Sequence, residues 1–260
     1  MDWLESIGSQ VFLLAVAMTR VASAFIVLPA FAPGTVPPLV RNSIFVSLGL
    51  IVYMLQPEIG TSELHALALI GIFAKEAALG LAIGLFFAIF LWALETAGQV
   101  IDGQIGMAMS QIIDPLSGHQ TSLTGAFLAR LANFVFMFSG GLLLVIAVLL
   151  ESYAIWPVMD GLPHLERAGA ALFAEEFQRL MTVAVMFAAP ALVILLTVDL
   201  ALGLVNRYAQ QLNVFSLSLS IKAWLATAVV LLILGTIVRS LIDDIQARPD
   251  FILNALRGLT

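Results

Sequence analysis

Residues 77–94, AALGLAIGLFFAIFLWAL, form a run of 18 residues without a charged side chain. A helix needs about 20 predominantly apolar residues to cross the hydrocarbon core of a bilayer. The whole chain has the same character, because hydrophobic residues make up 61% and charged residues only 11% of its 260 residues. Soluble domains carry about 25% charged residues. We therefore predict an all-α integral membrane protein. The unbroken runs also exclude a porin-type barrel, whose strands alternate between apolar and polar residues.

Other charge-free runs predict the remaining membrane helices; they cover residues 21–40, 42–57, 131–150, 180–198 and 223–238. The total is six apolar helices, or seven if residues 63–94 form two. We expect the first helix over residues 11–28 and the second over residues 39–55. Four prolines and Gly34 between them predict an irregular connection over residues 29–38.

The last third of the chain has a different plan. Two long helices are expected over residues 171–205 and 216–245, joined at residues 206–215, and Pro190 should kink the first of them. No internal repeat or interdomain linker is present, so residues 1–260 are predicted to form a single membrane domain.

Several function classes are excluded by composition and motif. The net charge is −6 and no cluster of basic residues exists, which argues against nucleic acid as a partner. The chain has no cysteine, and its three histidines show no metal-binding spacing. Nucleophile motifs and phosphate-binding loops are also missing. We therefore expect a non-enzymatic protein without a cofactor.

Charged residues inside apolar runs are costly and usually face protein or water. Five occur here: Arg20, Lys75, Glu76, Arg130 and Asp199. They favour either an ion pathway, as in a secondary transporter, or ion pairs that fix the structure or its assembly. Lys75 and Glu76 are consecutive and point about 100° apart on a helix, so we expect them to be poorly placed to pair with each other.

Small residues in the same region indicate close helix packing. Gly80 and Gly84 form a GxxxG pattern, which lets the backbone of another helix approach.

A polar segment follows the third apolar helix. Glu95, Gln99 and Asp102 fall on one helix face, and the sequence GQIGMAMSQIIDP follows at residues 103–115. This segment is too polar to span lipid and too apolar for an ordinary exposed loop. Irregular backbone of this kind is tolerated at membrane depth only where it is buried in protein or lines a cavity. It predicts either a deformable seal or a packed re-entrant turn.

Together, several local patterns resemble the T component of the type III secretion export gate, whose flagellar counterpart is the FliR family. The resemblance runs over about residues 11–222. The patterns that carry it are Leu28-Pro29, Arg41-Asn42, Ala74-Lys75-Glu76, Gly98-Gln99-Val100-Ile101-Asp102, Asp114-Pro115 with Gly118, Gly140-Gly141, Ser152-Tyr153 with Trp156-Pro157, and Gln211-Leu212-Asn213-Val214-Phe215 leading to Lys222.

Two of these patterns, Arg41-Asn42 and the stretch from Ser152 to Pro157, look more like the injectisome branch than the flagellar one. One departure is that the family usually has Ala-Pro-Gln before Leu-Asn-Val-Phe, whereas this chain has Ala209-Gln210-Gln211. Without that proline, the helix before this point could continue for longer.

The resemblance implies a multi-pass protein of the bacterial inner membrane that works beside R and S subunits and the U and V components of the export gate. Together they form a pore for unfolded secreted proteins. It further implies an R-like part over residues 1–170 and an S-like helical hairpin over residues 171–260. In such proteins the loop matching residues 103–121 plugs the closed pore.

These arguments assign two sets of candidate residues. The pore plug comprises Gly103, Gly106, Met107, Met109, Gln111, Asp114 and Pro115. The buried polar residues that would fix assembly are Arg20, Arg41, Lys75, Glu76, Asp102, Arg130, Asp199, Arg207, Asn213 and Lys222. The alternatives are a flagellar export gate subunit, a secondary transporter, an intramembrane enzyme, and a scaffold without a moving loop.

Overall fold

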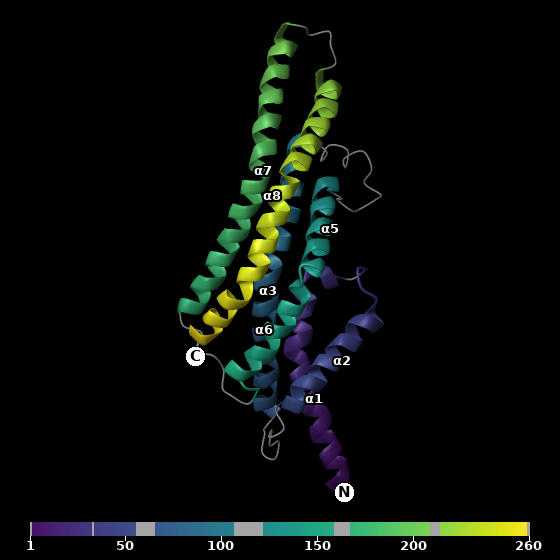
Figure 1. Ribbon diagram of the computed structural model, residues 1–260, viewed down its shortest axis with the longest axis vertical. Helices are drawn as coiled ribbons and strands as arrows, with labels where there is room; N and C mark the ends of the chain where they lie inside the picture. The colour runs from purple at the N-terminus through teal and green to yellow at the C-terminus, as the bar shows by residue number, and fades with distance from the viewer. Residues whose placement is uncertain are drawn as a thin grey trace. The chain divides into compact units, whose positions relative to one another are not determined.

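The computed structural model describes residues 2–32, 34–55, 66–106, 122–158, 167–208 and 214–258 (Figure 1). In chain order the elements are α1 (Asp2–Val27), the short 3-10 helix η1 (Pro29–Phe31), α2 (Pro38–Leu55), α3 (Ala66–Ile105), α5 (Leu123–Phe138), α6 (Gly141–Ile155), α7 (Arg167–Tyr208) and α8 (Val214–Gly258). These segments contain no strand, and the predicted all-α fold is confirmed.

The membrane class is confirmed as well. In the described part of the chain, α1, α3, α7 and α8 are each long and apolar enough to cross a bilayer. Helices α5 and α6 pass the same test as a pair, although they are bent by 66°. The predicted runs 77–94, 180–198 and 223–238 lie wholly within α3, α7 and α8.

Prolines set the boundaries near the start of the chain. Helix α1 ends at Val27, and Leu28 is extended with φ −72° and ψ 121°, because the residue before a proline is disfavoured in the helical region. Helix α2 begins at Pro38, where the missing N–H has no intrahelical partner to lose. The predicted irregular connection is confirmed for its described residues.

Two expectations from the sequence are corrected. Helix α3 is continuous from Ala66 to Ile105, so a division of this region into two helices is wrong. The run 131–150, expected as a single helix, is broken between α5 and α6. The break lies at Gly140, whose φ of +85° belongs to the left-handed region that glycine adopts without steric penalty.

The two predicted long helices are present as α7 and α8, and both are longer than expected. Helix α8 continues past Pro249 to Gly258 instead of ending at residue 245. Tertiary contact explains part of this extension, since Trp156 Nε1 donates a hydrogen bond to the Leu256 carbonyl at 3.2 Å. The connection predicted at residues 206–215 lies partly outside the described residues.

The chain divides into two compact units. The first comprises Met1–Ile89, Met137–Glu176 and Ile245–Thr260, and the second Phe90–Phe136 and Phe177–Asp244. The core of the first unit includes Val16, Ala17, Val52, Tyr153 and Val158. In the second unit, α7 and α8 run side by side in opposite directions (Figure 1), with Arg179 paired to Asp244.

The close packing predicted from the two glycines is confirmed in the first unit. A Cβ atom at Gly80 would overlap Ser23 Oγ and the Arg20 carbonyl, and a Cβ atom at Gly84 would overlap the Ala24 carbonyl. The backbones of α1 and α3 are therefore in direct contact along this face.

Candidate functional site

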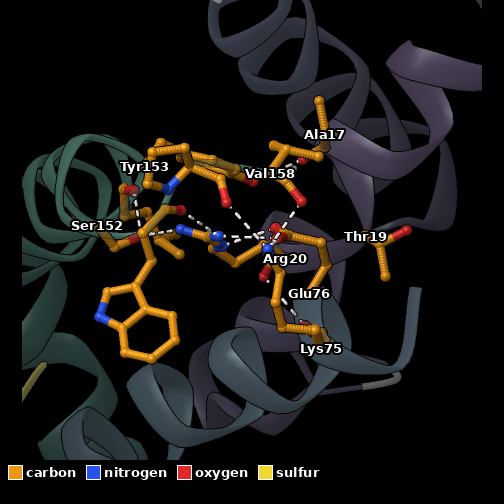
Figure 2. A network of polar contacts seen from close by, with 12 residues as sticks. Ala17, Thr19, Arg20, Lys75, Glu76, Ser152, Tyr153 and Val158 are labelled. Carbon is orange, nitrogen blue, oxygen red and sulfur yellow. Dashed lines mark hydrogen bonds and ion pairs between the residues drawn. The ribbon is translucent and has the colours of Figure 1, made fainter. Parts of the chain in front are cut away.

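A buried cluster of charges in the first unit joins α1, α3 and the end of α6 (Figure 2). Arg20 on α1 donates from Nε to Glu76 Oε2 at 2.8 Å and from an Nη atom to Glu76 Oε1 at 2.9 Å. The exposed fraction of both side chains is 0%. This two-bond geometry is the strongest that arginine and a carboxylate form, because two parallel charge-assisted bonds fix both planes.

Lys75 belongs to the same cluster. Its Nζ lies 3.3 Å from Glu76 Oε1, so the expectation that these consecutive residues are poorly placed to pair is wrong. The angle between neighbouring side chains on a helix holds at Cβ, but the long lysine side chain can turn back toward the carboxylate. Lys75 Nζ also donates to the carbonyls of Pro157 at 2.9 Å and Val158 at 2.7 Å.

The arginine makes three further contacts with the α6 end. It donates to Ser152 Oγ at 3.0 Å and to the Trp156 carbonyl at 2.9 Å, and its guanidinium lies 3.9 Å from the centre of the Tyr153 ring. The Tyr153 hydroxyl in turn donates to the Ala17 carbonyl at 2.6 Å. Figure 2 shows Arg20 between the Glu76 carboxylate and the α6 residues.

The cluster therefore contains two cations and one carboxylate. Carbonyl groups at the C-terminal end of α6 accept from both cations, and a helix C-terminus carries partial negative charge that favours cations. Each cation is paired with the carboxylate within this chain, and the carbonyl oxygens accept from the cations where the one carboxylate does not, which accords with an ion-pair role in structure. Of the residues involved, Ser152, Tyr153 and Trp156 had a signal in the sequence only as marks of resemblance, because they contact Arg20 across more than a hundred residues.

A second polar cluster lies in the other unit and connects α3 to the start of α5. Asp102 Oδ2 accepts from Ser122 Oγ at 2.6 Å and from the Thr124 backbone N–H at 2.8 Å, and Oδ1 accepts from Thr124 Oγ1 at 2.5 Å. Ser122 Oγ also accepts from the Gly125 N–H at 2.9 Å. The carboxylate thus satisfies backbone and hydroxyl donors at the N-terminus of α5, where a negative charge is favoured.

A third polar cluster connects the end of α3 to α7 and α8. Lys222 Nζ lies 2.9 Å from Asp199 Oδ1 and donates to the Gln104 carbonyl at 3.0 Å. Gln104 Nε2 donates to Asp199 Oδ2 at 3.2 Å. Asp199 is therefore paired inside the chain with a lysine that the sequence analysis had placed in the same set.

The backbones of α3 and α5 also touch. A Cβ atom at Gly98 would overlap the backbone N and Cα of Gly125. Gly98 lies one helical turn before Asp102, so α3 and α5 are held together by backbone packing as well as by hydrogen bonds.

Only two of the predicted plug residues are described. Gly103 is exposed in the last turn of α3, and Gly106 follows that helix with a φ of +93°. Met107, Met109, Gln111, Asp114 and Pro115 lie outside the described residues, as does Asn213.

Three predicted assembly residues stand apart from the clusters. Arg130 on α5 and Arg207 at the end of α7 are exposed. Arg41 on α2 is half-buried, and its Nε is buried without a hydrogen-bond partner. Their role in assembly stays a prediction.

Another buried pair was missed by the sequence analysis. Arg248 donates to Glu176 Oε2 at 2.7 Å, and the two side chains are 2% and 5% exposed. The residues are 72 positions apart, and no local pattern predicts such a contact. In the described segments no group of three or more His, Asp or Glu residues could hold a metal ion.

Comparison with known proteins places the chain in a family. Residues 11–247 match the family described as bacterial export proteins, family 1. The chain is 34% identical over 211 residues to Yop proteins translocation protein T of Yersinia pestis, a match that covers 81% of each chain. It is 30% identical over 255 residues to surface presentation of antigens protein SpaR of Shigella flexneri, covering 97% of each chain.

A flagellar relative is also similar. Flagellar biosynthetic protein FliR of Bacillus subtilis is 30% identical over 204 residues, covering 78% of each chain. Compared with this flagellar relative, the Yersinia protein has a higher identity to the chain and the Shigella protein matches more of it. Both differences agree with the injectisome branch that the sequence favours. The chain therefore belongs to the bacterial export protein family 1 and is a multi-pass inner-membrane component of a type III secretion export apparatus.

Proposed function

We propose that this chain is a non-enzymatic wall subunit of the export pore, and that residues 103–121 plug the pore when it is closed. The neighbours in this proposal are the R and S subunits and the U and V components, and the cargo is an unfolded secreted protein. Residues 1–170 would be the R-like part and residues 171–260 the S-like hairpin.

The apolar surface of α7 and α8 supports a place among other subunits or lipid. Of the apolar window in α3, 67% is buried within the chain, but only 28% is buried in α7 and in α8. Phe177, Val185 and Leu200 on α7 are 61%, 59% and 73% exposed. Exposed apolar surface of this extent marks contact with lipid or protein.

The observation that carries the plug proposal is the way in which both ends of the segment are attached. At its start, the Gln104 carbonyl accepts from Lys222 on α8. At its end, Ser122 and Thr124 donate to Asp102 on α3. The described residues on either side of residues 107–121 are thus held by α8 and α3, so we expect that displacing the segment between them need not disturb these helices.

Deleting residues 107–111 tests the plug. We expect the complex to assemble, as judged by co-purification of its subunits with the tagged chain, and to conduct ions after reconstitution into lipid bilayers. A matched control replaces the same five residues by a Gly/Ser segment. This control keeps the length of the loop unchanged but removes its apolar side chains.

The outcomes separate the alternatives. A leak in the deletion alone shows that loop length maintains the seal, and a leak in both variants shows that the apolar side chains do. Unchanged conductance in both variants contradicts the plug and favours a scaffold. Purification of the wild-type chain as a monomer that takes up a small solute contradicts the subunit proposal and favours a secondary transporter.

Asp102→Asn tests the attachment of the segment. The amide keeps one acceptor oxygen but loses the second acceptor and the charge, and hydrogen bonds to a charged group contribute about 1.5–3 kcal/mol. We expect the ion conductance of the Asp102→Asn complex to exceed that of the wild type slightly and to stay below that of the deletion variant. A leak as large as that of the deletion would show that the attachment, rather than the segment, closes the pore.

A further inference from the structure

Helix α5 carries a narrow exposed stripe that none of the polar clusters uses. Leu123, Phe127 and Phe134 are 66%, 46% and 58% exposed, and Arg130 is exposed between the last two. With 100° between successive residues, all four lie within about 60° of arc. They extend over about 17 Å of the helix at 1.5 Å per residue. The stripe is therefore three bulky apolar side chains with a single cation inside.

The cation on this stripe has no opposite charge in the described part of the chain: no ion pair there includes Arg130. The same segments pair Arg20, Lys75, Lys222 and Arg248 with carboxylates. An arginine in a membrane-crossing helix normally faces protein or a water-filled cavity, where it finds a partner. We therefore expect a negatively charged group from outside the described residues to pair with Arg130.

A groove adjoins the end of the stripe that contains Leu123 and Phe127. It has a volume of about 260 Å³ and is lined by Leu123, Thr124 and Phe127 on α5 and by Thr227, Val230 and Leu231 on α8. Four of these six side chains are apolar, so the groove accepts an apolar side chain. Arg130 follows Phe127 by three residues, which places the cation about one turn along the helix from the groove.

We propose that the α5 stripe binds a membrane helix of another export-apparatus subunit that carries a carboxylate about one turn from a bulky apolar residue. The carboxylate pairs with Arg130, and the apolar residue enters the groove. Arginine and aromatic side chains are enriched at the centres of protein interfaces, where the surrounding apolar contacts exclude water. The inference rests on the proposed assembly with partner subunits.

The spacing favours a helix over a phospholipid as the occupant. A phosphate group bound to Arg130 would bring the headgroup region to the middle of the stripe, where Phe127 and Phe134 are exposed on either side. A carboxylate on a packed helix reaches the cation without water and leaves both aromatic rings in an apolar environment.

The experiment uses the whole complex and a photo-reactive amino acid. With benzoyl-phenylalanine in place of Phe134, we expect irradiation to yield a covalent product with a second protein subunit. The same photo-reactive residue in place of Leu200, which is 73% exposed on α7, shows how much product an exposed apolar position outside the stripe gives. Arg130→Glu should reduce the product and the recovered complex at least about tenfold, because truncating or reversing one partner of a buried charge pair is strongly unfavourable. Arg130→Lys should retain most of both.

The results distinguish this inference from the proposed function. If the wild-type chain co-purifies with other subunits but Phe134 reacts only with lipid, the stripe faces the bilayer and the inference is wrong. Normal assembly of the Arg130→Glu complex would overturn it as well. A compensating Glu→Arg or Asp→Arg change on the cross-linked helix that restores assembly of Arg130→Glu would confirm the pair. Absence of any co-purifying subunit from the wild type would instead contradict the proposed function.

Discussion

Removing the carboxylate of the buried charge cluster should destabilise the first unit strongly. Glu76 accepts two bonds from Arg20, at 2.8 and 2.9 Å, and lies 3.3 Å from Lys75 Nζ. In Glu76→Ala both cations stay buried, since their side chains are 0% and 2% exposed. Carbonyl groups and one hydroxyl would then be the acceptors that remain to them.

The size of the effect follows from this geometry. Breaking a buried ion pair by removing one partner costs about 3–5 kcal/mol, because an uncompensated charge is left behind. For a chain of this size, 1 kcal/mol corresponds to roughly 2–4 °C in Tm. We therefore expect Glu76→Ala to lower the melting temperature by about 10 °C. Glu76→Gln keeps the volume and one acceptor and should lie between the mutant and the wild type.

The assay is thermal unfolding of the detergent-purified protein, followed by tryptophan fluorescence. The matched control is the double variant Arg20→Met with Glu76→Leu, which removes one charge of each sign. Replacing a buried pair by apolar residues is often neutral, so the double variant should be more stable than Glu76→Ala. A loss below about 1 kcal/mol for Glu76→Ala, or a double variant at least as unstable as the sum of its single changes, would refute this reasoning.

Two further changes test helix contacts in the second unit and share that melting assay. Gly98→Ala should cost about 1–3 kcal/mol, because its methyl group meets the Gly125 backbone, which cannot rotate away. Gly71→Ala is the control: no atom lies within 4 Å of its Cβ position, so stability should be unchanged or slightly increased. Lys222→Met should cost roughly 1–3 kcal/mol by leaving Asp199 without its cation, and adding Asp199→Asn should recover most of the loss. Equal melting temperatures for the two glycine variants, or no recovery in the double variant, would contradict these contacts.

The positions of the helices could be predicted because apolar side chains alone decide whether a segment enters the membrane. The run at 77–94 lies inside α3, and the long helices of the last third are present as α7 and α8. The break at Gly140 could not be read in the same way, since a count of charges contains no information on backbone dihedrals. The extension of α8 to Gly258 likewise depends on a contact from Trp156, which is distant in sequence.

The candidate sites were predictable as residues but not as partnerships. A charge in an apolar run indicates that a partner exists, which identified Arg20, Glu76 and Asp199. It does not say which partner, because several arrangements of the helices satisfy the same charges. The local rule for consecutive helix positions even gave the wrong answer for Lys75, because it ignores the length of the side chain.

The cations of the buried cluster have a consequence for how this region tolerates mutation. Lys75 is held by main-chain oxygen atoms of Pro157 and Val158, which every amino acid supplies. Alanine scanning of those two positions would leave both acceptors in place and report this contact as unimportant. The contribution of this contact to stability can be measured only by substituting Lys75, or by replacing the backbone amide with an ester, whose carbonyl oxygen is a weaker acceptor. The side chains at positions 157 and 158 can therefore change while the hydrogen bonds from Lys75 to their main-chain carbonyls are kept.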